Sequence, residues 1–177
     1  MTIDEQGRPE PPPSGTESET ILGVVDFLRA TLEWKCSGLS DEQLARPLAS
    51  STMTLSGMLT HLAFVEDYWC SFVVGEAPMP EPWATMVWDA DEDADWHLAD
   101  ELTGDAVHAL WTQRVATSTA VVASLLSEDV DALSRLHRRG DTEASLRWVL
   151  PHLIEEYARH CGHADLLREA VDGQVGE

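Results

Sequence analysis

The stretch of sequence that decides the fold is SLRWVLPHLIEEYARHCGHADLLRE, residues 145–169. Its apolar residues recur every three or four positions, which predicts one face of a long helix packed against a core. His152, Glu156 and His160 are four positions apart, so their side chains stack along one side of the same helix. The sequence therefore predicts a row of polar side chains next to the apolar stripe of a helix.

Three other stretches show the same helical spacing of apolar residues. They span residues 17–36, 54–74 and 105–126. The capping-box sequence Ser40-Asp-Glu-Gln43 predicts a short helical turn after the first of them. The last helix ends at Val171 and begins at either Ser145 or Leu150. With the start at Ser145, Pro151 lies past the first turn, where a proline kinks a helix. With the start at Leu150, it lies in the first turn, where proline is tolerated.

Four long amphipathic helices without a convincing strand predict an all-α fold, a four-helix bundle. Residues 1–16 form a proline-rich N-terminal arm, which either packs on the bundle or stays mobile. Residues 17–173 form the bundle, and residues 174–177 form a tail. Three cysteines, an odd number without a Cys-x-x-Cys pair, argue against a disulfide framework. We expect a single domain that buries its own core.

Two connections between the predicted helices are long. Residues 76–101 hold three prolines, three tryptophans and the acidic run Asp89–Asp95, and they predict a long acidic loop without regular structure. The acidic run is expected to be a solvated face. The tryptophans expected to anchor this loop are Trp83, Trp88 and Trp96. The second connection, residues 127–144, carries the main basic cluster of the chain.

The chain has 32 acidic and 11 basic residues, which gives a formal net charge of -21. This charge repels phosphate backbones and anionic lipid headgroups, so nucleic acid and membranes are excluded as partners. No stretch approaches the roughly 20 apolar residues of a membrane span, and the first residues lack the apolar core of a secretion signal. We expect a cytoplasmic protein. The basic residues are arginines apart from Lys35, which is typical of a GC-rich genome.

His61 lies inside the apolar stripe of the second predicted helix. A lone histidine there is more often a satisfied core residue than a ligand. The row on the last helix favours a ligand, because burying His152, Glu156 and His160 without partners costs a few kcal/mol per group. Such a row needs mutual hydrogen bonds or a cation, unless it faces water. We predict a divalent metal shared with His61.

The ligand set follows from the spacing. Glu156 and His160 are one turn apart and can converge on a point beside the helix, with His61 as the third ligand. His152 and His163, one turn to either side, then contact the ligands or a substrate. Zinc is the expected metal, with nickel, iron and manganese as alternatives. Three protein ligands leave one position open for water or a thiol, whose pKa the metal lowers.

Residues 145–169, together with Thr60-His-Leu-Ala-Phe-Val-Glu66 and residues 29–44, resemble the DinB-like superfamily of metal-binding four-helix bundles. This superfamily includes mycothiol S-transferases and mycothiol-dependent maleylpyruvate isomerases, and the resemblance covers nearly the whole chain. The resemblance implies a metal histidine on the second helix and two ligands four residues apart on the last. In this sequence these are His61, Glu156 and His160.

The resemblance implies a metal-dependent thiol S-transferase. In such an enzyme a low-molecular-weight thiol, here expected to be mycothiol, binds the metal as thiolate and attacks an electrophile. His163 and Arg159 would orient or protonate the substrate, although an exposed ion pair with Glu155 is the competing interpretation of Arg159. The residues that would line the lid and bind the cosubstrate are Trp83, Trp88 and His97.

Two other function classes stay open from the sequence. A metal-dependent hydrolase or isomerase would use the open metal position for hydroxide or for a polarised carbonyl. A non-catalytic metal-binding stress protein would fill the coordination sphere with its own side chains. The expected partners are a small thiol and an electrophile, and a homodimer is a further expectation.

Overall fold

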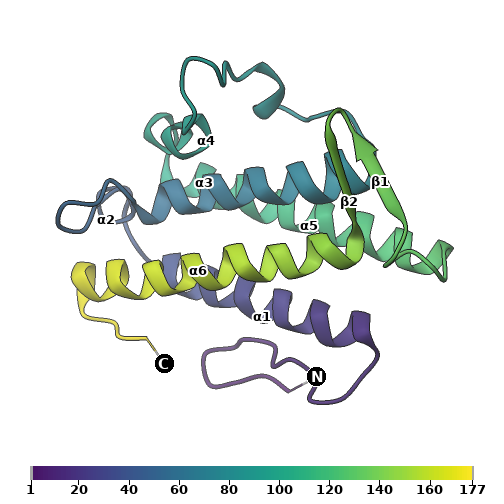
Figure 1. Ribbon diagram of the computed structural model, residues 1–177. Helices are drawn as coiled ribbons and strands as arrows, with labels where there is room; N and C mark the ends of the chain where they lie inside the picture. Colours follow the sequence, from purple (N-terminus) through teal and green to yellow (C-terminus); the bar gives the residue numbers. More distant parts are fainter. Residues whose placement is uncertain (1, 177) are drawn as a thin grey trace. The chain divides into compact units, whose positions relative to one another are not determined.

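Long helices form most of the structure, a computed structural model that describes residues 2–176 (Figure 1). The elements in chain order are α1 (Glu17–Cys36), α2 (Asp41–Leu44), α3 (Leu55–Glu66), η1 (Asp67–Val74), η2 (Trp83–Thr85), α4 (Ala94–His97), η3 (Leu98–Glu101), α5 (Gly104–Glu128), β1 (Leu136–Arg139), β2 (Thr142–Ser145) and α6 (Leu146–Asp172). The four long helices predicted from apolar spacing are all present. The prediction of a mostly helical protein is therefore confirmed.

Backbone contacts divide the chain into two compact units. Unit 1 is the described part of Met1–Leu55 together with that of Leu150–Glu177, and unit 2 is Ser56–Val149. Unit 1 contains α1 and residues 150–172 of α6, and unit 2 contains residues 56–66 of α3, continued by η1, together with α5.

Local side-chain contacts explain where the helices of unit 1 begin. Thr16 and Glu19 form a capping box at the start of α1, each side chain bonded to the other's backbone N–H. Ser40 and Gln43 form the same motif at α2, as predicted. Helix α6 begins at Leu146, the earlier of the two predicted positions, so Pro151 lies inside the helix.

In unit 1 the helices α1 and α6 run in the same direction, side by side (Figure 1). The Cys161 thiol of α6 donates a hydrogen bond to the carbonyl of Leu28, at 3.4 Å. Two turns later, Arg168 donates to the carbonyl of Lys35, at 2.9 Å. Because both contacts advance together along the two helices, the pair is parallel.

The tail after α6 is held by a buried lysine. Lys35 is 0% exposed, and its ammonium group lies 2.9 Å from Asp165 Oδ1 and donates to the carbonyl of Val175 at 2.9 Å. The ammonium also lies 4.0 Å from the ring centroid of Trp34. A buried charge needs such partners, so Lys35 ties the tail to the helix pair.

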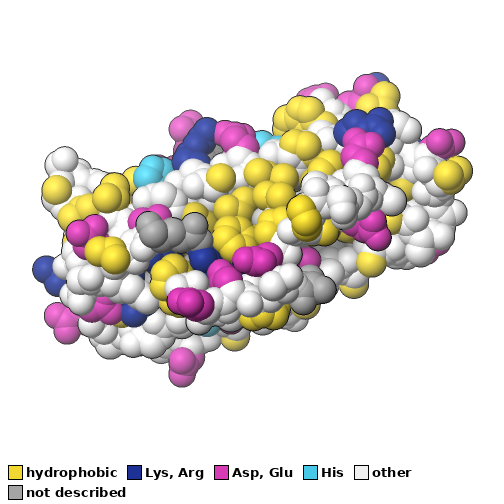
Figure 2. All heavy atoms as spheres, turned by 90° about the horizontal axis from the view of Figure 1, so that it is seen from below, with side chains coloured by type: hydrophobic (Ala, Val, Ile, Leu, Met, Phe, Trp, Pro, Cys, Tyr) yellow, Lys and Arg dark blue, Asp and Glu magenta, His cyan; other side chains and the backbone are white. Residues whose placement is uncertain are grey.

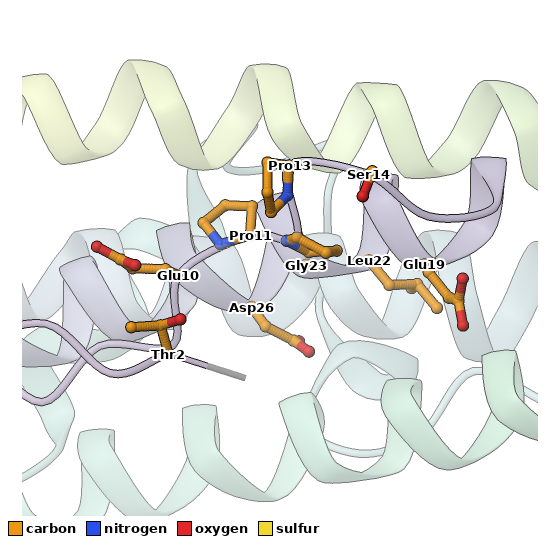
Figure 3. A pocket seen from close by; sticks show the side chains of 10 residues that line it. Thr2, Glu10, Pro11, Pro13, Ser14, Glu19, Leu22, Gly23 and Asp26 are labelled. Atoms are coloured by element: carbon orange, nitrogen blue, oxygen red, sulfur yellow. The ribbon is translucent and has the colours of Figure 1, made fainter.

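The N-terminal arm packs on α1, which settles the alternative left open by the sequence. Arg8 is buried, with its guanidinium bonded to Asp4 at 2.7 Å and to Thr31 Oγ1 at 3.1 Å, and 4.6 Å from the ring centroid of Phe27. Farther along, the prolines of the arm lie over Gly23 of α1 (Figure 3). Arm and helix enclose a cavity of about 650 Å³.

Gly23→Ala is expected to displace the arm. A Cβ at Gly23 would lie 2.5 Å from Pro12 Cδ, so the arm must shift even though alanine is the better helix former. We expect faster amide hydrogen exchange at Asp4 and Glu10, whose N–H groups bond within the arm. Exchange mass spectrometry of residues 2–14 measures this.

The control for this variant is Gly162→Ala, where an added Cβ meets nothing within 4 Å. This substitution should leave the arm unchanged and stabilise the protein by about 0.5–1 kcal/mol, because alanine loses less backbone entropy in a helix. Unchanged exchange in the arm of Gly23→Ala would contradict the packing argument.

In unit 2 the second long helix changes its winding. Residues 55–66 are α-helical, and residues 67–74 form π-helical turns, in which Gly75 N–H bonds to the carbonyl of Cys70 at 3.0 Å. The sequence predicted one α-helix, because over only eight residues the apolar spacings of the two helix types are too similar to separate. The π-helical turns carry the buried carboxylate of Asp67.

Asp67 anchors the connection between η1 and α5. Its Oδ2 accepts a hydrogen bond from Trp83 Nε1 at 2.7 Å and lies 3.0 Å from Arg114 Nε of α5. Burial raises the pKa of Asp67, while the bond from Trp83 and the charge of Arg114 oppose that shift. Arg114 also donates to the carbonyl of Glu81 at 2.5 Å. The first third of the connection is therefore fixed to η1 and α5.

The predicted long acidic loop is not structureless, and this corrects the sequence analysis. It contains the single helical turns η2, α4 and η3. Their short length explains why no periodic pattern marked them. The three tryptophans do anchor the segment within unit 2. Trp83 and Trp88 lie 5.5 and 4.7 Å from the ring of Phe64, and Trp96 lies 4.6 Å from that of His61.

Trp83→Phe is expected to lower the free energy of unfolding by about 1–3 kcal/mol, because the buried Asp67 carboxylate loses a donor. Chemical denaturation measures the change. Trp88→Phe is the control, since Trp88 is partly exposed and contributes a ring contact that phenylalanine retains. An equal effect of both substitutions would contradict the role given to the Trp83 hydrogen bond.

A two-stranded antiparallel sheet, β1 paired with β2, replaces the linker predicted for residues 127–144. His137 and Ala144 pair and are buried, whereas Arg138 and Glu143 pair as an exposed ion pair. The turn is made by Gly140, whose φ of 58° favours glycine. The expectation of no strand was wrong, because four residues per strand, rich in arginine, show too little apolar alternation.

Acidic side chains are spread widely over the face shown in Figure 2, and Lys and Arg gather in a few places. This distribution agrees with the net charge of -21. Among residues 2–176, no helix combines the length and the apolar character of a membrane span.

Candidate functional site

The predicted polar row lies along α6 of unit 1. The carboxylate of Glu156 is 3.6 Å from His152 Nε2 through one oxygen and 3.6 Å from His160 Nε2 through the other. The side chains of His152, Glu156 and His160 are 20, 15 and 7% exposed. The row is therefore largely shielded from water, and one carboxylate lies between two imidazoles.

Two further residues of α6 extend this row. Glu155 Oε2 lies 3.1 Å from His152 Nδ1, and His152, Glu155 and Glu156 each offer a ligand atom within 4.8 Å of the others. His163 Nδ1 lies 3.4 Å from His160 Nδ1. The two ring nitrogens of His160 thus have different neighbours: Nδ1 faces His163, and Nε2 faces the carboxylate of Glu156.

The two residues predicted to act on the substrate have different surroundings. Arg159 is exposed and forms an ion pair with Glu155, four residues earlier, as the competing interpretation of the sequence expected. His163 is partly buried, and burial lowers its pKa first, followed by the nearby His160 and Arg159.

His61 lies on α3 in unit 2, among buried apolar neighbours of the same helix. Its Nδ1 is 2.7 Å from Asp95 Oδ2, and the Asp95 side chain is 6% exposed. The imidazole stacks on Trp96, with ring centroids 4.6 Å apart and an interplanar angle of 17°. A buried carboxylate and an aromatic ring together fix the orientation of this histidine.

Asp95 corrects the interpretation of the acidic run as a solvated face. Asp89, Glu92 and Asp93 are exposed, whereas Asp95 is buried and faces His61. The sequence did not reveal the burial of Asp95, because the acids of the run look alike locally. His61 gave an indirect indication, because a histidine in an apolar stripe needs a polar partner and a carboxylate is a common one.

The residues predicted to line a lid have separate positions in unit 2. Trp83 is 1% exposed and bonded to Asp67, so it belongs to the core. Trp88 is partly exposed over Phe64. His97 is exposed, and its Nδ1 lies 2.7 Å from Asp91 Oδ2, an interaction that raises the pKa of His97.

All three cysteines are buried, and none forms a disulfide with another. Burial is the largest of the effects that raise the pKa of Cys161 to about 12, and burial also raises the pKa of Cys36. A thiol with so high a pKa is not a nucleophile near neutral pH. If the chemistry uses a thiol, that thiol comes from a substrate.

Comparison with known proteins gives one family. The family model described as mycothiol-S-transferase matches residues 20–173, nearly the whole chain. A crystal structure of a conserved protein from Enterococcus faecalis has a similar fold, with a TM-score of 0.61 and 18% sequence identity. The match covers 91% of this chain and 100% of that one. The curated proteins include no match.

Proposed function

The chain belongs to the mycothiol S-transferase family, and from this premise we propose that it is a metal-dependent thiol S-transferase that uses mycothiol. The observation that carries the proposal is the shielded row on α6, where the Glu156 carboxylate lies 3.6 Å from His160 Nε2. An S-transferase needs a means to ionise a thiol, and the cysteines of the chain are buried.

The residues fit a divalent metal. We propose His61, Glu156 and His160 as its ligands, since two imidazoles and a carboxylate form the donor set of catalytic zinc sites that keep one position open. In a metal-binding histidine one ring nitrogen binds the metal while the other bonds to a carboxylate or another polar group. His61 has such a partner in Asp95, and His160 has one in His163. Zinc is the proposed metal, with nickel, iron and manganese as alternatives.

A divalent metal held by these residues would lower the pKa of a thiol, so that the thiol ionises near neutral pH. The sulfur then forms a bond to the electrophilic carbon, the thiol proton passes to a base, and the leaving group departs with its bonding electrons. We propose His163 and Arg159 as the residues that orient or protonate the electrophile. Arg159 would exchange its ion pair with Glu155 to do so.

Other parts of the proposal concern the surroundings of the site. Trp88 and His97 are proposed to contact the bound cosubstrate, because both are accessible, whereas Trp83 holds the segment to its unit. His152 is proposed to support Glu156 through their 3.6 Å contact. A cytoplasmic location suits an enzyme of reduced thiols. A homodimer remains a prediction.

His61→Ala is expected to abolish metal binding with the fold intact, because it removes one of three ligands. Elemental analysis of the purified protein, supported by circular dichroism, measures both properties. Glu156→Gln and His160→Ala should behave alike. The control is His108→Ala, which removes a histidine of α5 that is not among the proposed ligands. Stoichiometric metal in His61→Ala would remove His61 from the ligand set.

Product formation from a model electrophile should depend on the thiol. With zinc-loaded enzyme, mycothiol should give an S-conjugate that mass spectrometry detects, and glutathione and bacillithiol should give less. Unchanged turnover of the electrophile without any thiol would contradict S-transfer and favour a metal-dependent hydrolase or isomerase.

A further inference from the structure

We propose that Asp95 is a positioning residue for the metal ligand His61, which makes the acidic segment between η2 and η3 part of the metal site. The proposal rests on the proposed function, because it assumes that His61 binds metal. Nothing in the sequence distinguished Asp95 from the other acids of its run. The geometry of its carboxylate within unit 2 does distinguish it.

The contact between Asp95 and His61 is short and shielded. Asp95 Oδ2 lies 2.7 Å from His61 Nδ1, and the two side chains are 6 and 19% exposed. A carboxylate accepts hydrogen bonds and does not donate them when ionised, so it holds the proton of the neutral imidazole on Nδ1. The lone pair of the imidazole then lies on Nε2, and this nitrogen can bind a metal.

The imidazole is held on its face as well as on its edge. Trp96, the residue after Asp95, stacks on the ring at 4.6 Å between centroids and 17° between planes. Edge and face contacts from adjacent residues restrict both rotation and tilt of the ring. A ligand that is already oriented loses less entropy when it binds metal, so the affinity rises.

The turn that presents Asp95 and Trp96 has its own support. Asp93 O accepts hydrogen bonds from Trp96 N–H at 2.9 Å and from His97 N–H at 3.0 Å. The His97 imidazole lies 2.7 Å from Asp91 Oδ2 across the same turn. The turn is thus held by the backbone carbonyl of Asp93 and the side chain of Asp91, and the buried acid of the run, Asp95, contacts the histidine.

A purely structural role is the alternative to this proposal. In that case the Asp95 contact would only stabilise the segment, and its loss would change stability without changing the metal affinity of the protein. Metal affinity therefore separates the two roles, while the tautomer of His61 tests whether the Asp95 carboxylate fixes the proton on Nδ1. If the proposal holds, the order of the segment and metal occupancy are thermodynamically linked.

The first experiment compares the zinc affinity of wild type, Asp95→Ala, Asp95→Asn and Asp93→Ala by competition with a chelator. We expect Asp95→Ala to bind zinc about 10–100-fold more weakly, the effect typical of losing such a partner. Asp95→Asn should lose less, because its amide oxygen still accepts from Nδ1–H. Asp93→Ala is the matched control, an exposed acid of the same run, and should bind as wild type does.

The second experiment needs no metal. Nitrogen-15 NMR of the metal-free protein should show His61 with its proton on Nδ1, and Asp95→Ala should shift the population toward the Nε2–H form. Circular dichroism checks that the variant is folded, and Asp95→Leu, which also lacks an acceptor and fills more of the space, serves if it is not.

The outcomes separate the two proposals. Wild-type zinc affinity in Asp95→Ala would overturn the role of Asp95, while loss of metal in His61→Ala would leave the proposed function intact. If wild-type protein binds no zinc, the proposed function fails, and the tautomer measurement alone decides whether Asp95 orients His61.

Discussion

Shielding imidazoles and carboxylates from water without leaving them unpaired is the constraint on which this structure depends. An unpaired polar group in such a place costs a few kcal/mol, a large part of the stability of a small protein. On α6 the carboxylate of Glu156 lies between two imidazoles, and in unit 2 the carboxylate of Asp95 faces His61. The proposed function rests on these polar side chains.

The same constraint organises the rest of each unit. In unit 2, the buried carboxylate of Asp67 contacts Trp83 and Arg114. These contacts hold the segment that carries Asp95 against η1 and α5. In unit 1, the buried Lys35 holds the tail through its bond to the Val175 carbonyl. Irregular segments are therefore fixed by single buried charges, which explains how long connections acquire a defined conformation in a mostly helical chain.

The sequence predicted the long helices well because the spacing of apolar residues is a local signal, and it predicted the short turn α2 because the capping box of Ser40 and Gln43 is local too. It missed the β1–β2 hairpin, whose strands are too short and too charged to show alternation. It also misjudged Asp95, because the burial of one acid within an acidic run depends on a histidine far away in the sequence. His61, the isolated polar residue in an apolar stripe, was the best available indication that such a partner exists.

The most direct test of the central claim is the anomalous scattering of zinc in crystals of the metal-loaded protein. The account predicts one strong peak about 2.0–2.2 Å from an imidazole nitrogen of His61, an imidazole nitrogen of His160 and a carboxylate oxygen of Glu156. A peak bound elsewhere, for example by Asp91 and His97, or no peak in zinc-saturated crystals, would contradict it.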